Sequence, residues 1–287
     1  MRHVVTRRAP LYTRRALSSG ASARNESVAD VALMTTLLAS DEAQPVIHER
    51  PNAASPFFIT CDHAGNFMPR SLGNLGVSAI DCARHIAWDI GALGVARELA
   101  ALLDGELVAQ RYSRLVIDCN RPPNSAELFT ERSEATDIPG NHALTDAARE
   151  ARRAHIYAPY HDTISSLLDA RAAGGRATLY IAVHSFTPVY RGGARPWQLG
   201  VLSSDDRRLA EPVLEFLRTH GDLCIGDNEP YRIDEKDHGI PAHALSRGLP
   251  NVLLEIRQDL IAQERGQRAW AQRLAATLRH ACTVLKF

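Results

Sequence analysis

The sequence predicts an α/β layered domain, and two observations support this class. From Pro56 onward, short apolar runs alternate with longer amphipathic stretches, as they do where strands are followed by helices. The chain has 287 residues and is 45% hydrophobic, so it can bury a sizeable core in one large domain or two small ones.

We expect strands at the β-prone apolar runs and helices at the stretches with helical spacing. The stretch 79–103 ends at Asp104-Gly105, a turn signal. Pro159 should kink the stretch 143–173 or split it in two. The expected strands are 57–62, 105–111, 114–119, 178–184, 198–203 and 251–256, and the expected helices are 79–103, 143–173, 206–220 and 260–284.

The first 25 residues carry six arginines and no acidic residue. This composition is typical of a transit peptide. It fits equally a disordered extension, or a start placed upstream of a true start at Met34. We place residues 1–45 outside the fold as an N-terminal extension and residues 46–287 in a single domain.

Charge and hydropathy exclude several classes of function. Lys+Arg and Asp+Glu both number 33, so nothing predicts binding to nucleic acid or to an acidic membrane surface. No stretch approaches the ~20 apolar residues of a membrane span. The five cysteines form no Cys-x-x-Cys pair, which predicts thiols in a reducing, cytoplasmic compartment. A nucleophile role for Cys61 or Cys119 is the weaker alternative.

Two histidines follow apolar runs that we expect to be buried strands. His63 comes after 57–62 and His184 after 179–183. Ligands bind at the carboxyl ends of strands in open α/β sheets, so both imidazoles could bind one metal ion. The alternative is a pair of unrelated loop residues. Asp89 shares a face of the expected helix with His85. It could be a ligand or orient a ligand histidine, or be an ordinary early-helix acid.

Other polar groups follow further expected strands. Arg121, after Asn120, presents a planar fork suited to a carboxylate. The alternative is a surface arginine that pairs with a nearby acidic residue. Glu255 lies in an apolar run and is costly to bury unless it is paired or coordinating. It could be a general base toward a metal-activated water, or form an ion pair with Arg257 or Arg114. His161 and His238 are additional candidates, with loop or helix-cap histidines as the alternative.

Taken in order, these motifs resemble the N-formylglutamate amidohydrolase family. They span about 57–283, which is nearly the whole expected domain. The matching pieces are Cys-Asp-His-Ala-Gly-Asn (61–66), His-Ile-Ala-Trp-Asp-Ile-Gly-Ala (85–92), Tyr-Ser-Arg (112–114) running to Asp-Cys-Asn-Arg-Pro (118–122), Tyr-Ala-Pro-Tyr-His (157–161), Val-His-Ser-Phe (183–186) and Leu-Glu-Ile-Arg (254–257).

The resemblance implies a three-layer α/β/α fold with a central mixed, mostly parallel sheet. Such a fold is phosphorylase/hydrolase-like and akin to zinc carboxypeptidases and aspartoacylase. The resemblance also implies hydrolysis of N-formyl-L-glutamate to formate and L-glutamate, dependent on Zn²⁺ or another divalent metal. The partner is then a small anionic N-acyl amino acid, and the usual pathway of the family is histidine degradation.

Carried over by position, His63 and His184 look like metal ligands and Glu255 like the base. In the related carboxypeptidases a glutamate ligand follows the first histidine by three residues, where this chain has Asn66. Asp89 is therefore the expected third ligand, with the Asn66 carbonyl oxygen as the alternative. The expected substrate contacts are Asn120 and Arg121 on a carboxylate, Arg114 on the oxyanion, and His161 and His238.

Two other functions stay open. One is a deacylase or carboxypeptidase acting on another N-acyl amino acid, and the other is a carboxylate-binding homologue without catalysis. The sequence leaves the oligomeric state unknown.

Overall fold

The computed structural model describes residues 36–287, which form one compact unit. Most of the expected N-terminal extension, including Met34, lies outside the described residues, and the boundary expected at residue 45 stays a prediction. No helix in the described part of the chain is long and apolar enough to cross a membrane.

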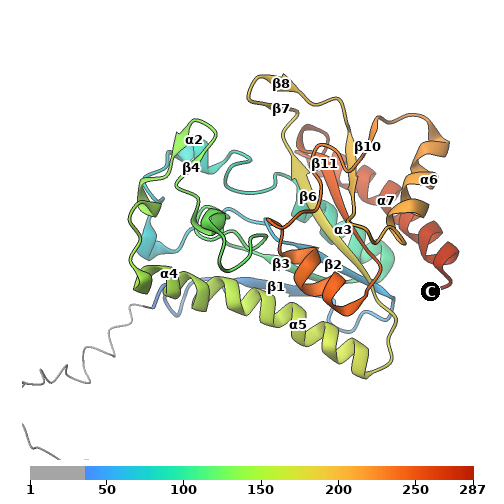
Figure 1. Cartoon of the computed structure of the whole chain (residues 1–287), viewed down its shortest axis with the longest axis horizontal. Helices are drawn as coiled ribbons and strands as arrows, with labels where there is room; N and C mark the ends of the chain where they lie inside the picture. Colours follow the sequence, from blue (N-terminus) through green and yellow to red (C-terminus); the bar gives the residue numbers. More distant parts are fainter. Residues whose placement is uncertain (1–35) are drawn as a thin grey trace, which may run out of the picture. The chain divides into compact units, whose positions relative to one another are not determined.

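Within residues 36–287, seven strands form the central sheet of the molecule (Figure 1). They are β1 (Val46–Glu49), β2 (Phe57–Cys61), β3 (Glu106–Gln110), β6 (Leu179–Phe186), β9 (Leu199–Leu202), β10 (Ile225–Asp227) and β11 (Asn251–Arg257). The order is β1-β3-β2-β6-β11-β9-β10. Only β1 with β3 and β9 with β11 pair antiparallel in this sheet; the remaining neighbours are parallel. The expected mixed, mostly parallel sheet is confirmed.

Helices flank this sheet, and two small hairpins lie outside it. The α-helices of the described residues are α2 (Ala79–Cys82), α3 (Ala92–Leu103), α4 (Asp146–Arg152), α5 (Ala158–Ala173), α6 (Ala210–His220) and α7 (Glu264–Leu285). Shorter helical turns are η1 (Arg70–Leu72), η2 (Ala126–Phe129), η3 (Pro139–Asn141), η4 (Arg153–Tyr157), η5 (Ile240–Ala244), η6 (Leu245–Arg247) and η7 (Gln258–Leu260). The hairpins pair β4 (Arg132–Ser133) with β5 (Thr136–Asp137) and β7 (Val189–Tyr190) with β8 (Gly193–Ala194).

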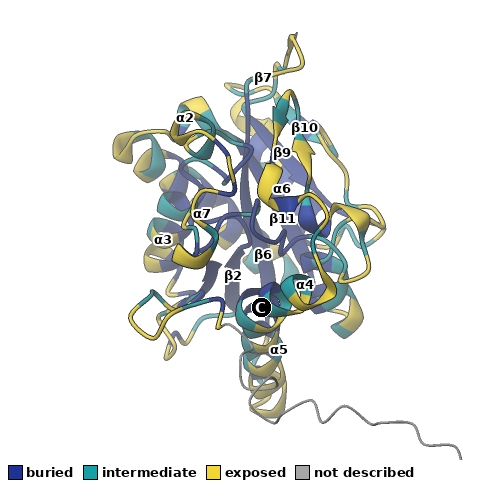
Figure 2. Ribbon diagram, turned by 90° about the vertical axis from the view of Figure 1, so that its left-hand side faces the viewer, coloured by how far each residue is buried: buried dark blue, intermediate teal, exposed yellow. Residues whose placement is uncertain are grey.

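Both faces of the sheet are covered, which makes three layers. Successive strand side chains point to opposite faces. Ile59, Ile181 and their neighbours pack with α3, α6 and α7, whereas Phe58 and Tyr180 pack with α5 and irregular segments. In Figure 2 the central strands of the sheet are buried and the outer sides of the helices are exposed. Burial on both sides explains why the strands read as continuous apolar runs.

Two expected elements are wrong. Residues 114–119 are a series of turns and not a strand, although Leu115 and Ile117 are buried. The run is apolar because it packs in the layer that contains α5, without pairing in the sheet. The expected helix 79–103 is divided into α2 and α3 by the turns of residues 83–91, the last of which is Gly91 with a left-handed φ of 81°. A Cβ at Gly91 would lie 2.1 Å from the Ile261 carbonyl oxygen.

The other expected elements are present with small shifts at their ends. The stretch 143–173 is interrupted by the π-type turn η4, directly before Pro159, as the missing proline donor predicts. The short strands β1 and β10 were not expected.

Candidate metal centre

A cleft with a volume of about 520 Å³ opens at the carboxyl ends of the parallel strands. His63 follows β2, and His184 lies in β6. Glu255 lies in β11 in register with His184. Asp89 comes from the turn before α3. All four side chains line the cleft, so the structure brings the expected ligands and base together.

His63, Asp89 and His184 form a compact buried group. Asp89 Oδ2 lies 2.8 Å from His184 Nδ1 and 3.5 Å from His63 Nδ1. One ligand atom of each residue lies within 4.8 Å of those of the other two. The His63 Nδ1 atom is buried without a hydrogen-bond partner. Two imidazoles and a carboxylate are a donor set suited to zinc, so the residues present fit a metal ion.

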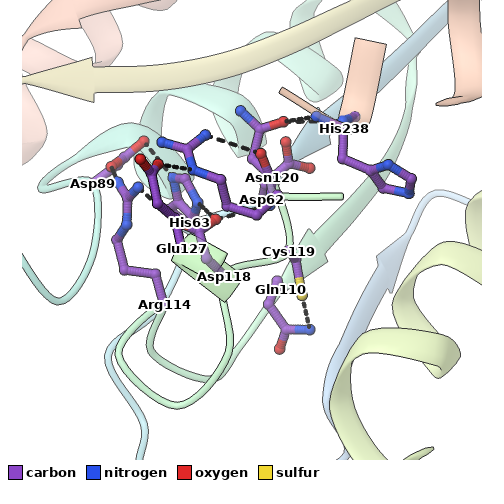
Figure 3. A network of polar contacts seen from close by, with 12 residues as sticks. Asp62, His63, Asp89, Gln110, Arg114, Asp118, Cys119, Asn120, Glu127 and His238 are labelled. Atoms are coloured by element: carbon purple, nitrogen blue, oxygen red, sulfur yellow. Dashed lines mark hydrogen bonds and ion pairs between the residues drawn. The ribbon is translucent and has the colours of Figure 1, made fainter. Parts of the chain in front are cut away.

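The far nitrogen of each histidine faces a second carboxylate. His63 Nε2 lies 2.7 Å from Asp118 Oδ1, and His184 Nε2 lies 3.4 Å from Asp62 Oδ2. The Tyr160 hydroxyl donates a hydrogen bond to Asp62 Oδ1. Figure 3 shows the part of this network around His63 and Asp118. Metal-binding histidines in proteins almost always have such a partner, which fixes the ring orientation.

The backbone holds the same group in place. The Asp89 N–H donates to the His63 carbonyl oxygen at 2.9 Å. Directly after His63, the chain passes so close to Arg111 that a Cβ at Gly65 would lie 2.1 Å from the Arg111 carbonyl oxygen. Only glycine fits at that turn.

The charges of the group favour a cation. Burial raises the pKa of Asp89, Asp118 and Asp62, but neighbouring cationic groups outweigh it and lower all three. The main cationic group is Arg114 for Asp118, and the two histidines for Asp89 and Asp62. Although burial lowers it, the pKa of His63 and of His184 is raised in turn by these carboxylates, and a divalent ion would take the place of the protons that the two imidazoles hold.

Glu255 differs from these aspartates because burial dominates its titration. Its side chain is buried, and its Oε2 atom has no hydrogen-bond partner. Burial raises the pKa of Glu255 to about 7. A carboxyl group with this pKa can both accept and release a proton near neutral pH.

The expected carboxylate clamp already has partners in the structure. Arg121 Nε lies 3.2 Å from Glu127. The Asn120 side chain donates to Asp237 at 3.0 Å and accepts from the backbone N–H groups of His238 and Gly239. Asn120 therefore anchors the loop around residue 238, and both Asn120 and Arg121 line the cleft.

Three other candidate residues lie outside the buried group of His63, Asp89 and His184. The Asn66 side chain donates to the Cys82 carbonyl oxygen. Asn66 does not belong to the group of residues that could hold a metal ion. His161 and His238 pack against Tyr157, with ring centroids 4.2 Å and 5.7 Å from its ring. Neither lines the cleft.

Arg114, which we expected to contact the oxyanion, belongs to the turns of residues 114–119. It lines the cleft, and donates to Asp118 at 2.7 Å. The roles of Asp118 and Asp62 were missed by sequence reasoning. The signal was available, since Asp62 adjoins His63 and Asp118 adjoins the Cys-Asn-Arg motif, and carboxylates commonly accompany ligand histidines.

The fold and this site define a class of three-layer α/β protein with a buried His/Asp/His group, suited to a metal ion, at the carboxyl ends of the strands. The model of the N-formylglutamate amidohydrolase family matches residues 55–262. The chain belongs to this family of hydrolases.

Solved structures share this fold. A gene product of Agrobacterium tumefaciens is 40% identical, with a TM-score of 0.85 over 88% of this chain and 100% of the other. N-formylglutamate amidohydrolase from Ralstonia eutropha is 20% identical, with a TM-score of 0.59 over 85% of this chain and 99% of the other, and shows a shared fold. No curated protein matches the chain.

Proposed function

We propose that this protein is a zinc-dependent amidohydrolase that cleaves N-formyl-L-glutamate into formate and L-glutamate. The observation that carries the proposal is the buried group of His63, Asp89 and His184, with Glu255 lining the same cleft. Membership in the family supports a small N-acyl amino acid as the substrate.

The protein groups would divide the chemistry as follows. His63, Asp89 and His184 would hold the metal ion. When bound, zinc would lower the pKa of a water molecule and polarise the amide carbonyl. Glu255 accepts a proton from the attacking water as the new C–O bond forms at the formyl carbon. It then delivers this proton to the nitrogen as the C–N bond breaks, which releases formate and the free amine.

Arginines bind the negative charges of the reaction. Arg114, which lines the cleft beside the aspartates, stabilises the oxyanion of the tetrahedral intermediate. Arg121, the residue after Asn120, binds the substrate carboxylate. In this proposal the substrate carboxylate takes the place of Glu127, whose side chain is 48% exposed and can turn into solvent.

A Glu255→Gln variant tests the base. An amide at this position cannot accept the proton, so kcat for N-formyl-L-glutamate should fall by about 10²- to 10⁴-fold. Zinc content per chain, measured by emission spectroscopy, should stay unchanged. Glu211→Gln, which replaces an exposed glutamate of α6, is the matched control with wild-type kcat. Full activity in Glu255→Gln with bound zinc would rule out this role.

The cleft volume favours a second candidate within the same reaction class. About 520 Å³ is large for a formyl group, and a deacylase for longer N-acyl amino acids would use this space. Comparing kcat/KM for the formyl, acetyl and succinyl derivatives of L-glutamate separates the two. The proposal requires the formyl derivative to be the best substrate.

We also infer a cytoplasmic location and a place in histidine degradation. The first inference is supported by free cysteines, since Cys61, Cys82, Cys119, Cys224 and Cys282 are all unpaired among the described residues. The second rests on family membership. Localisation of a tagged chain and growth on histidine as nitrogen source would test them.

A further inference from the structure

A group of arginines at the cleft lacks acidic partners. Arg121 and Lys236 contact Glu127, and Arg114 contacts Asp118. By contrast, Arg191, Arg195 and Arg232 form no ion pair with any acidic residue in the described part of the chain. Arg191 and Arg232 line the cleft. A guanidinium fork without a carboxylate, at the cleft of an enzyme, is suited to an anionic ligand.

Arg195 joins the two segments that carry the other arginines. Its guanidinium carbon lies 4.7 Å from the ring centroid of Tyr190 and 4.7 Å from that of Tyr231. It also donates to the Tyr231 hydroxyl at 2.8 Å. The β7–β8 hairpin, at the top of Figure 1, is thereby held to the segment that follows β10. Stacking of this kind is stabilising without any acid.

Each tyrosine is followed directly by one of the free arginines. Tyr190 precedes Arg191, and Tyr231 precedes Arg232. Both tyrosines and both arginines line the cleft, so Arg195 holds the two Tyr-Arg pairs together at its wall. Asp234 is close in sequence, but its carboxylate accepts the Lys236 backbone N–H at 2.8 Å.

On the basis of the proposed function, we propose that Arg191 and Arg232 bind the side-chain carboxylate of a dicarboxylic N-acyl amino acid. Arg195 is a positioning residue that holds both arginines in place through the tyrosines. Arg121 binds the α-carboxylate at a separate place in the cleft. The enzyme therefore distinguishes glutamate from its neutral isostere glutamine by these rim arginines.

The test compares N-formyl-L-glutamate with N-formyl-L-glutamine in the wild type and in the double variant Arg191→Ala/Arg232→Ala. The wild type should prefer the glutamate derivative. In the double variant, kcat/KM for this substrate should fall about tenfold or more, mainly through KM, as expected for a lost charge-assisted contact. The glutamine derivative should change less than about twofold. Arg132→Ala is the matched control, because Arg132 also lines the cleft but pairs with Asp137.

Several outcomes would overturn the inference while leaving the proposed function intact. One is a wild type that hydrolyses both substrates equally well. Another is a double variant that keeps the wild-type preference. Equal losses on both substrates would show general attraction of anions instead of recognition of the side chain.

A binding measurement covers the case in which neither substrate is hydrolysed. Calorimetry with glutarate, a dicarboxylate without an amide, should show binding to the wild type that is at least tenfold weaker in the double variant. If this holds without hydrolysis, the proposed function fails and the arginine site stands. If the wild type and the double variant bind glutarate equally, the arginine site fails.

Discussion

His63 and His184 each contact a carboxylate outside the buried group that they form with Asp89. Asp118 holds His63 through Nε2, so the Nδ1 atom of that ring is directed at Asp89. Without Asp118, the ring could rotate or bind its proton on the wrong nitrogen. The contribution of Asp118 to function is therefore one of orientation.

An Asp118→Asn variant should bind zinc about 10- to 100-fold more weakly than the wild type. Competition with a chelator of known affinity measures this. Asp137→Asn is a matched control, because Asp137 lies 3.1 Å from the ring of His142 on the surface, and it should bind zinc like the wild type. Unchanged affinity in Asp118→Asn would contradict an orienting role.

The buried pair His161 and His243 makes stability depend on pH. The two rings share a contact of 2.8 Å, and burial lowers the pKa of His161 to about 3 and that of His243 to about 4. Both values lie below the ordinary value of about 6.5. Below about pH 6.5 the unfolded chain therefore binds protons at these two histidines that the folded chain does not bind. The stabilisation is complete above about pH 6.5, decreases progressively below that pH, and is fully lost once the pH has fallen through about 4 for His243 and about 3 for His161.

At pH 5, each of these histidines should cost about 2 kcal/mol of folding free energy relative to pH 7. Urea unfolding at the two pH values measures the loss. His243→Gln should lose about 2 kcal/mol less than the wild type over this range. The exposed His220→Gln should show the wild-type loss. An identical loss in His243→Gln would mean that other groups cause the acid sensitivity.

Among helices and loops, the segment 113–141 lies outside the central sheet. Its buried backbone groups therefore need hydrogen-bond partners other than those that strand pairing supplies. A buried arginine of α4 supplies some of them. Arg152 donates to the carbonyl oxygens of Val116 and Gly140 and to the side chain of Asn141. This segment carries Arg114, Asp118 and Arg121, so Arg152 supports the site indirectly.

Arg152→Met should lower the free energy of unfolding by about 3 kcal/mol. The reason is that buried acceptors left without a donor cost about 1–3 kcal/mol each. Urea denaturation measures the change. Arg149→Met, in the same helix but half-buried and with one carbonyl contact, should cost less than about 1 kcal/mol. Equal effects of the two substitutions would argue against this support.

The same segment shows why part of the fold could not be predicted. The centre of the run, residues 115–117, is as apolar as β2 or β6, and periodicity cannot say whether such a run pairs in a sheet or packs as a turn. Pairing depends on partners elsewhere in the chain. By contrast, the start of α3 had a visible signal, since it follows Gly91, and glycine adopts left-handed conformations that other residues rarely adopt.

Over the whole molecule, the site is assembled by the order of the strands. β2, β6 and β11 are neighbours and parallel, so their carboxyl ends lie at one edge. This rule made His63, His184 and Glu255 predictable as one group. It could not predict Arg191 or Arg232, because they lie on a hairpin and a loop whose positions depend on the Arg195 stack.

In the proposed function, His63, Asp89 and His184 hold one metal ion that the hydrolysis requires. The most direct measurement is a zinc titration of the chelator-stripped protein, with hydrolysis of N-formyl-L-glutamate followed at each step. We predict negligible activity without metal and a linear rise that ends at one zinc per chain. Full activity in the stripped protein would contradict the claim, and so would an unchanged titration in His184→Asn.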